Sequence, residues 1–164
     1  MTIERKIIMV LDTEACDLAG NVYDVGYTIA DRKGVILTKK NFLVEEIFTD
    51  ASKMMGAFYA KKLFTHYAPM LDRNTIALTP WQSIVAEMQI DVDAFGVNVL
   101  AAYNLGFDRR VMRQTNNLLG LGPIMPAMEM LDIWQFACET KLSQQTYKDI
   151  ARANGWVSSK GNIR

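Results

Sequence analysis

A chain of 164 residues is long enough for one domain with a well-filled core. Half of the residues are hydrophobic and 22% are charged, which is typical of a globular protein rather than a disordered one. The 18 basic and 18 acidic residues give a formal net charge of zero, which excludes a protein that coats nucleic acid through a large basic excess. This charge is still compatible with an enzyme that holds only a few nucleotides.

The cysteines and the apolar runs indicate where the protein resides. Cys16 and Cys138 lack the spacing of a metal site, which favours two free thiols in a reduced, cytoplasmic protein. No apolar run is long enough to cross a bilayer, and the first is too short for the core of a signal peptide. We therefore expect no membrane partner. Because no repeat or linker divides the chain, we expect a single domain over residues 1–164.

The first part of the chain predicts three strands. Apolar, β-branched and aromatic residues indicate strands over 6–13, 22–30 and 35–44. Because turn residues 31–34 separate the last two, we expect an antiparallel meander. Apolar residues then recur at three- and four-residue intervals, which predicts a helix over 46–71.

The second part predicts alternating helices and strands. Thr79 has the character of an N-cap and Pro80 that of a first helical residue, so a helix is expected from there to about Phe95. The later pattern predicts strands over 97–103 and 128–132 and helices over 107–119, 133–140 and 145–154. The fold class is therefore α/β, with a five-stranded mixed sheet of a three-strand meander and two parallel strands, flanked by helices.

Two carboxylates close the first apolar run. Asp12 and Glu14 follow residues 7–11, and the two-residue repeat of a strand places both on one face, roughly 7 Å apart. The carboxyl end of a buried strand is where sites form in open α/β sheets, although charged residues there are also often merely solvated. Carboxylate oxygens suit Mg²⁺, and two such ions can clamp a phosphodiester.

A third carboxylate, Asp108, falls in the first turn of the helix after the second buried strand. The helix dipole favours an acidic residue there whatever its function, and Asn104 has the character of a turn or cap residue. Two parallel neighbouring strands would nevertheless bring the carboxylates into one crevice. We expect those of Asp12, Glu14 and Asp108 to converge within about 4–7 Å.

These motifs resemble those of a known family. Leu11-Asp12-Thr13-Glu14 resembles the first motif of the DEDD (DnaQ-like) 3′–5′ exonucleases, which have an RNase H-like fold. Residues 23–26 are similar to the second-strand segment of that family, and residues 104–108 to its second motif, Asn-x-x-Phe-Asp. The resemblance covers nearly the whole chain, and its general character is closest to the small exonucleases of tailed phages.

The resemblance implies an activity and roles for single residues. It implies Mg²⁺- or Mn²⁺-dependent hydrolysis from the 3′ end of single-stranded DNA or RNA, releasing nucleoside 5′-monophosphates. Asp12, Glu14 and Asp108 would be the catalytic metal ligands, with Asp12 bridging two ions. The residues bordering the substrate would be Thr13, Ala15, Cys16, Asn104 and Phe107.

The third motif of the family, His-x-x-x-x-Asp or Tyr-x-x-x-Asp on a final helix, has no match. The single histidine, His66, lies far too early, and the spacing from Tyr147 to Asp149 is too short. We therefore expect the C-terminal helix to be missing, and with it the fourth metal ligand and the general base.

Three explanations of this departure compete: a truncated exonuclease, a natural short form that only binds nucleic acid or protein, or a helix supplied by a partner or second copy. The abrupt final loop favours truncation. Loss of the helix would expose apolar surface and favour a homo-oligomer. An unrelated α/β binding protein with accidental carboxylates is the remaining reading. Host cytoplasm is the expected location if a phage encodes the chain.

Basic side chains follow the same motifs. Arg109, Arg110 and Arg113 lie on the helix of Asp108, and Lys39-Lys40 and Lys61-Lys62 form two basic pairs. They are interpreted either as phosphate contacts or as a solvated surface. The sequence does not distinguish DNA from RNA.

Overall fold

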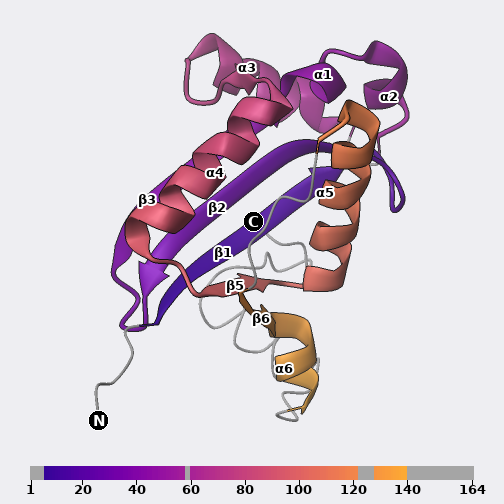
Figure 1. The fold of residues 1–164 in the computed structure, drawn as a ribbon. Helices are drawn as coiled ribbons and strands as arrows, with labels where there is room; N and C mark the ends of the chain where they lie inside the picture. Colours follow the sequence, from indigo (N-terminus) through magenta and orange to yellow (C-terminus); the bar gives the residue numbers. More distant parts are fainter. Residues whose placement is uncertain (1–5, 58–59, 122–127, 140–164) are drawn as a thin grey trace, which may run out of the picture.

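The computed structural model describes residues 6–57, 60–121 and 128–139. The expected helix over 145–154, the third-motif region and the predicted loss of the C-terminal helix lie outside these ranges. Residues 1–5, 58–59, 122–127 and 140–164 are drawn as a grey trace in Figure 1.

The centre of the fold is a six-stranded mixed sheet with the order β4-β3-β2-β1-β5-β6 (Figure 1). The predicted meander is confirmed, because β2 pairs antiparallel with both β1 and β3. The two parallel strands are also confirmed, since β5 pairs parallel with β1 and β6 with β5. The strands are β1 (Ile7–Ala15), β2 (Val22–Asp31), β3 (Ile36–Val44), β4 (Leu78–Thr79), β5 (Val99–Ala102) and β6 (Glu129–Asp132).

The prediction of five strands was one too few. Strand β4 runs parallel to β3 at the edge of the sheet, where Leu43 pairs with Leu78 and Val44 with Thr79. A strand of two residues is too short to show the alternation of apolar and polar side chains by which strands are recognised. The extra strand extends the expected architecture without changing it.

Seven helices are present in the described ranges. The predicted helices over 107–119 and 133–140, and the one expected to end near Phe95, are confirmed within a few residues. No helix among the described residues is long and apolar enough to cross a membrane. The helices are α1 (Glu45–Phe48), α2 (Ala51–Met55), the π-helix η1 (Leu63–Tyr67), α3 (Ala68–Asp72), α4 (Trp81–Phe95), α5 (Leu105–Leu119) and α6 (Ile133–Glu139).

The prediction of a single helix over 46–71 is wrong, because this region is divided into four short helices. The Asp50 side chain accepts hydrogen bonds from the backbone N–H groups of Ser52 and Lys53 and so begins a new helix at α2. Helix α2 then ends at Gly56. Local N-capping therefore overrides the apolar spacing that indicated one continuous helix.

The start of α4 also differs from the prediction. Thr79 lies in β4, and Pro80 occupies the N-cap position without a side-chain hydrogen bond. The capping role belongs to Glu46 of α1, whose two carboxylate oxygens accept from the backbone N–H of Trp81 at 3.0 and 3.1 Å. A carboxylate at a helix N-terminus satisfies an otherwise unpaired N–H and is favoured by the helix dipole.

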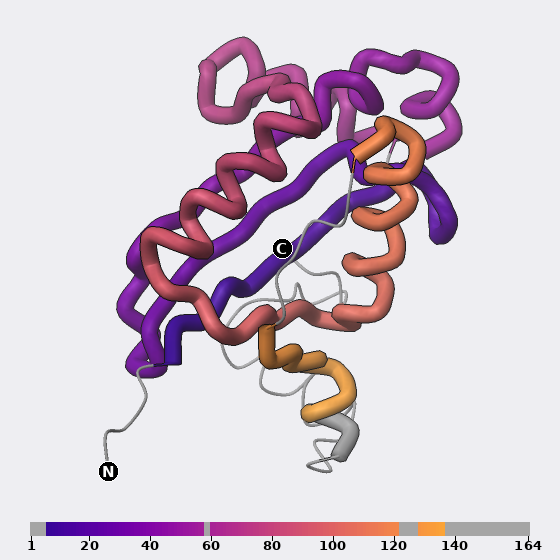
Figure 2. The backbone as a smooth tube through the Cα atoms, in the orientation of Figure 1, coloured from indigo at the N-terminus to yellow at the C-terminus, as the bar shows by residue number. Residues whose placement is uncertain are grey.

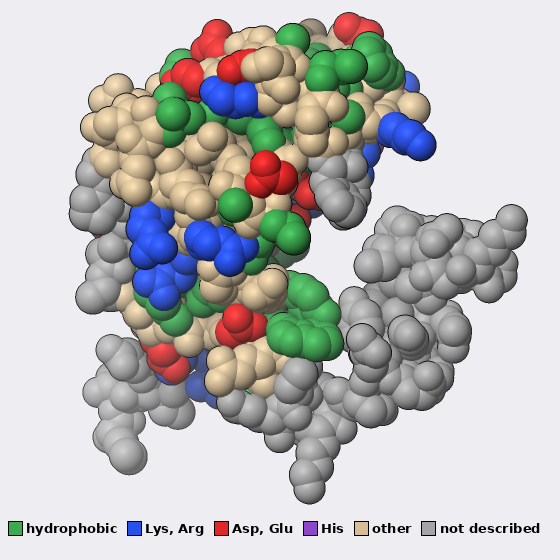
Figure 3. Space-filling view, turned by 90° about the vertical axis from the view of Figure 1, so that its right-hand side faces the viewer, with side chains coloured by type: hydrophobic (Ala, Val, Ile, Leu, Met, Phe, Trp, Pro, Cys, Tyr) green, Lys and Arg blue, Asp and Glu red, His purple; other side chains and the backbone are tan. Residues whose placement is uncertain are grey.

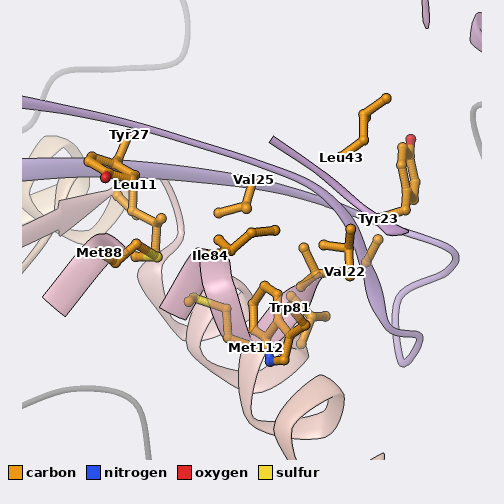
Figure 4. Close-up of a cluster of buried hydrophobic side chains, with 14 of the residues drawn as sticks. Leu11, Val22, Tyr23, Val25, Tyr27, Leu43, Trp81, Ile84, Met88 and Met112 are labelled. Carbon is orange, nitrogen blue, oxygen red and sulfur yellow. The ribbon is translucent and has the colours of Figure 1, made fainter. Parts of the chain in front are cut away.

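The core lies between the sheet and the two long helices, α4 and α5, whose backbones run alongside the strands (Figure 2). The Tyr27 hydroxyl of β2 donates to Asp91 of α4 at 2.7 Å, and the Thr115 hydroxyl of α5 accepts from the backbone N–H of Val22 at 2.9 Å. Both helices therefore cover the same face of the sheet. Figure 4 shows buried side chains at the centre of the core, among them Leu11, Val25, Trp81, Ile84, Met88 and Met112.

Helix α4 offers a matched pair of isoleucines that tests this packing. Ile84 is fully buried, whereas Ile90 is 60% exposed. Ile84→Ala should lower the free energy of unfolding by about 2–5 kcal/mol through lost apolar contact and a cavity. Ile90→Ala should change it by less than about 0.5 kcal/mol. Urea denaturation of both variants measures the difference, and equal losses would contradict the assigned orientation of α4.

Candidate functional site

Strand β1 carries the first two candidate residues on one face. Its burial alternates, so that Leu11 and Thr13 are buried toward α4 and α5 while Asp12 is exposed and Glu14 half-buried. Asp12 and Glu14 therefore share the face opposite these helices. This is the same-face arrangement that the two-residue spacing predicted.

Asp108 reaches β1 from the other side. It is 2% exposed in the first turn of α5, and its Oδ1 accepts from the Thr13 backbone N–H at 3.0 Å and from the Thr13 hydroxyl at 2.8 Å. Burial, together with the negative charge of Asp12, raises the pKa of Asp108 from its ordinary 3.8 to about 6, although the hydrogen bonds from Thr13 oppose this rise. The two carboxylates therefore interact across the strand.

A further carboxylate, Asp24, belongs to the same face as Asp12 and Glu14. Asp24 lies directly opposite Glu14 in the antiparallel register of β1 and β2. The Tyr67 hydroxyl donates to Asp24 Oδ2 at 2.6 Å. Burial raises the pKa of the Asp24 carboxyl, and the charges of Glu14 and Asp12 add to this effect, while the Tyr67 hydrogen bond opposes it. We refer to Asp12, Glu14 and Asp24 as the acidic face.

Asp24 lies within residues 23–26, which resemble the second-strand segment of the exonuclease family, but the sequence alone assigned it no role. Gly26 lies two residues after Asp24 on the same face of the sheet, and its contacts explain why a glycine stands at this position of the segment 23–26. A Cβ at Gly26 would lie 2.9 Å from Asn41 Oδ1, so glycine leaves room for this side chain. In the orientation that satisfies its neighbours, the Asn41 amide donates to Asp24 Oδ1 at 3.0 Å. A carboxylate within a buried strand, two residues before a glycine, was the signal that could have identified Asp24.

A lysine is paired with the acidic face. Lys62 Nζ lies 3.0 Å from Glu14 Oε1, with the two side chains 40% and 29% exposed. Lys62 immediately precedes η1, in the segment of short helices that Figure 1 places at the end of the sheet where β1 finishes. The Lys61-Lys62 pair was predicted as phosphate contact or solvated surface, whereas Lys62 forms an ion pair with a candidate catalytic residue.

The acidic face fits a divalent cation in part. Mg²⁺ is commonly held by one or two carboxylates together with water and substrate phosphate, and Asp12 and Glu14 supply such oxygens. The Lys62 ammonium beside Glu14 shows that a cation is accommodated there. Asp108 Oδ1 instead takes two hydrogen bonds from Thr13. Within the described residues, no group of three or more His, Cys, Asp or Glu is arranged to hold a metal ion. The three-carboxylate metal site therefore stays a prediction.

The predicted substrate-binding residues are divided between buried and accessible positions. Thr13, Ala15 and Cys16 are buried, so their side chains face the core. Asn104 is exposed at the start of α5 with a positive φ of 65°, and Phe107 packs partly buried against the core. Substrate contact at these five positions stays a prediction.

The arginines of α5 form a basic surface beside the loop after β1. Arg109, Arg110 and Arg113 are exposed, and the view from this side of the molecule shows Lys and Arg side chains gathered in one region (Figure 3). Arg110 donates to the carbonyl of Leu18 at 2.8 Å, and its guanidinium lies 5.5 Å from the centre of the Phe107 ring. Arg110 therefore joins α5 to the loop between β1 and β2.

Comparison with solved structures agrees with this architecture. The chain matches "Exonuclease X in complex with 5′ overhanging duplex DNA" with a TM-score of 0.50 and 20% sequence identity, over 93% of this chain and 75% of that chain. No protein-family model matches the sequence, and no curated protein matches it either. The chain thus shares the mixed α/β fold of that structure, in agreement with the RNase H-like fold class expected from the sequence.

The raised pKa of Asp108 predicts a pH-dependent stability in metal-free buffer. Its carboxyl holds a proton to about pH 6 in the folded state but only to its ordinary 3.8 when unfolded. Ionisation between these values therefore favours the unfolded chain, and stability falls as pH rises. Asp108→Asn should be the more stable protein above pH 7, by up to about 3 kcal/mol, and lose this advantage below about pH 4.

Urea denaturation at several pH values in EDTA measures this effect. Asp93→Asn on the exposed surface of α4 is the matched control, because it removes a carboxylate without removing a buried charge. A constant difference between Asp108→Asn and wild type from pH 4 to pH 8 would contradict the assigned ionisation.

Proposed function

We propose that the protein is a metal-dependent 3′–5′ exonuclease of the DEDD type that removes nucleoside 5′-monophosphates from single-stranded DNA or RNA. The observation that carries the proposal is the placement of Asp12 and Glu14 side by side at the carboxyl end of a central strand in this fold. The resemblance of residues 11–14 and 104–108 to the two exonuclease motifs supports it. So does the fold match to an exonuclease.

The proposed reaction is hydrolysis of the last phosphodiester. A water oxygen bonds to the terminal phosphorus as the bond from phosphorus to the preceding 3′-oxygen breaks. One proton of the water is given up, and the leaving 3′-oxygen takes up a proton. The products are a nucleoside 5′-monophosphate and a strand that is one residue shorter with a free 3′-hydroxyl.

Each residue of the site has a proposed part in this reaction. Asp12 and Glu14 would hold the divalent ion, Mg²⁺ or Mn²⁺, and Asp108 would support a second from the opposite side of the strand. When bound, such ions polarise phosphate oxygens and lower the pKa of water. Asp108 also fixes the end of β1 through Thr13. Asp24, held by Tyr67, places a further negative charge opposite Glu14.

A second candidate is a catalytically silent module that binds nucleic acid or protein on the same fold. The ion pair of Glu14 with Lys62 favours it, because a neutralised carboxylate can have a purely structural role. The two functions differ in whether bound oligonucleotide is shortened. A binding module would retain a single-stranded oligonucleotide unchanged in the presence of Mn²⁺.

Replacing Asp12 tests the assignment of the acidic face. Asp12→Asn should lower nucleotide release from single-stranded DNA or RNA in Mn²⁺ by about 100-fold or more, because a charged ligand is lost from the reacting centre. Asp93→Asn, on α4 and away from this face, should retain wild-type activity. Equal activity in wild type and Asp12→Asn would indicate a contaminating nuclease, and the assignment would then fail.

The polarity of degradation can be measured with end-labelled oligonucleotides. Removal of residues from the 3′ end should convert a 5′-labelled strand into a ladder of shorter products and release labelled mononucleotide at once from a 3′-labelled strand. A 3′-terminal phosphorothioate linkage should slow both reactions. Immediate release of mononucleotide from the 5′ label would contradict the proposed direction.

A further inference from the structure

The segment around η1 contacts the acidic face at two neighbouring points. Lys62 pairs with Glu14, and Tyr67, five positions later, donates to Asp24, which is the register partner of Glu14. One short segment thus serves two facing carboxylates. A π-helix such as η1 is rare and occurs frequently at functional sites.

The two contacts differ in mobility. Tyr67 is buried, and its ring packs edge-on against the rings of Tyr23 and Phe48 at 5.9 and 5.6 Å. The backbone of the segment is therefore anchored beside the sheet. Lys62 has a flexible four-carbon stem and is 40% exposed, so its ammonium can move while its backbone stays in place.

We propose that Lys62 has two alternating partners: Glu14 in the metal-free protein, and the substrate phosphate once a divalent cation occupies Glu14. This inference rests on the proposed exonuclease function. It makes Lys62 a residue that opposes metal binding and promotes substrate binding. The sequence predicted only a phosphate contact or a solvated surface for Lys62.

The electrostatics favour this exchange of partners. A divalent cation on Glu14 would repel an ammonium held 3.0 Å from the same carboxylate, so the two cations compete for one anion. The displaced ammonium still interacts with the Asp12 and Asp24 carboxyls, whose pKa values it lowers, and a substrate phosphate would add a further anion within reach of its stem. The phosphate that the metal ion binds brings negative charge to the same place, and lysine is a common phosphate ligand.

The proposal predicts effects of opposite sign in one variant. Removing the ammonium frees Glu14, so the metal should bind more tightly. It also removes a phosphate contact, so the substrate should bind more weakly at saturating metal. Loss of an ion pair whose lysine never contacts the substrate would tighten metal binding without weakening substrate binding.

The first measurement is Mn²⁺ affinity, from the electron paramagnetic resonance signal of free Mn²⁺ in titrations of the whole chain. Lys62→Gln should lower the Mn²⁺ dissociation constant by about fivefold, as expected for release of a partly exposed ion pair. Lys62→Met, which keeps the alkyl stem, should do the same and guards against misfolding of one variant. Lys62→Arg keeps the charge and Lys61→Gln removes an exposed neighbouring one, so both should stay within about twofold of wild type.

The second measurement is the KM for a single-stranded oligonucleotide at saturating Mn²⁺. Lys62→Gln should raise it by about tenfold, the effect of losing one charge-assisted contact, while Lys61→Gln leaves it unchanged. Unchanged or weaker Mn²⁺ binding by folded Lys62→Gln and Lys62→Met would overturn the inference. So would an unchanged KM.

The exonuclease proposal and the inference about Lys62 can be tested separately. If wild type binds Mn²⁺ and releases nucleotides but the Lys62 variants behave like wild type, only the inference about Lys62 is overturned. If wild type neither binds Mn²⁺ nor shortens oligonucleotides, the exonuclease proposal fails and the inference fails with it.

Discussion

The site depends on one interaction, the acceptance by Asp108 of two hydrogen bonds from Thr13. The pairing of β1 with β5 ends at Val10 and Ala101, while β1 continues beside β2 as far as Ala15. The second half of β1 therefore runs past its pairing with β5, and its backbone on that side needs another partner. Asp108 supplies it, so that α5 closes the gap where the two strands separate.

This arrangement places negative charge on both sides of a single strand. Asp108 lies on the helix side, and Asp12 and Glu14 lie on the opposite side. The charge of Asp12 contributes to the raised pKa of Asp108. Although Asp12 is exposed at the surface of the sheet, partial desolvation of its carboxyl and the charge of Glu14 raise its pKa, against the lowering effect of Lys62. Asp12 thus makes ionisation of Asp108 more costly, and Glu14 does the same to Asp12. Such a cluster is relieved by added positive charge, which is the physical basis for expecting a cation there.

The regular part of the fold could be predicted because its signals are local. The apolar run of β1 and the turn before β3 needed no knowledge of distant residues. The start of α4 could not be predicted in this way, since Glu46 caps Trp81 across a gap of 35 residues. The prediction over 46–71 failed for a different reason. Apolar spacing typical of a helix continues through Asp50 and Gly56, although Asp50 caps the start of α2 and Gly56 marks its end.

In the candidate site, too, the local features could be predicted from the sequence and the long-range contacts could not. The two-residue spacing of Asp12 and Glu14 fixes their common face, because a strand leaves no alternative. The pairing of Glu14 with Lys62 joins residues 48 positions apart, and that of Asp24 with Tyr67 joins residues 43 apart. Neither contact leaves a mark in the local sequence. The part of the site that depends on tertiary folding is therefore the part that sequence patterns missed.

These contacts bear on which group could accept a proton from water. Burial and the hydrogen bond to Asp24 raise the pKa of Tyr67 above its ordinary value, so its hydroxyl stays protonated near neutral pH and serves as a donor. Lys62 donates to Glu14 and is likewise no acceptor. The pKa values of Asp12 and Asp24 are raised, and a carboxylate becomes a stronger base as its pKa approaches neutrality. Among the described groups on this face, the carboxylates are therefore the acceptors, and Tyr67 and Lys62 are hydrogen-bond donors to them.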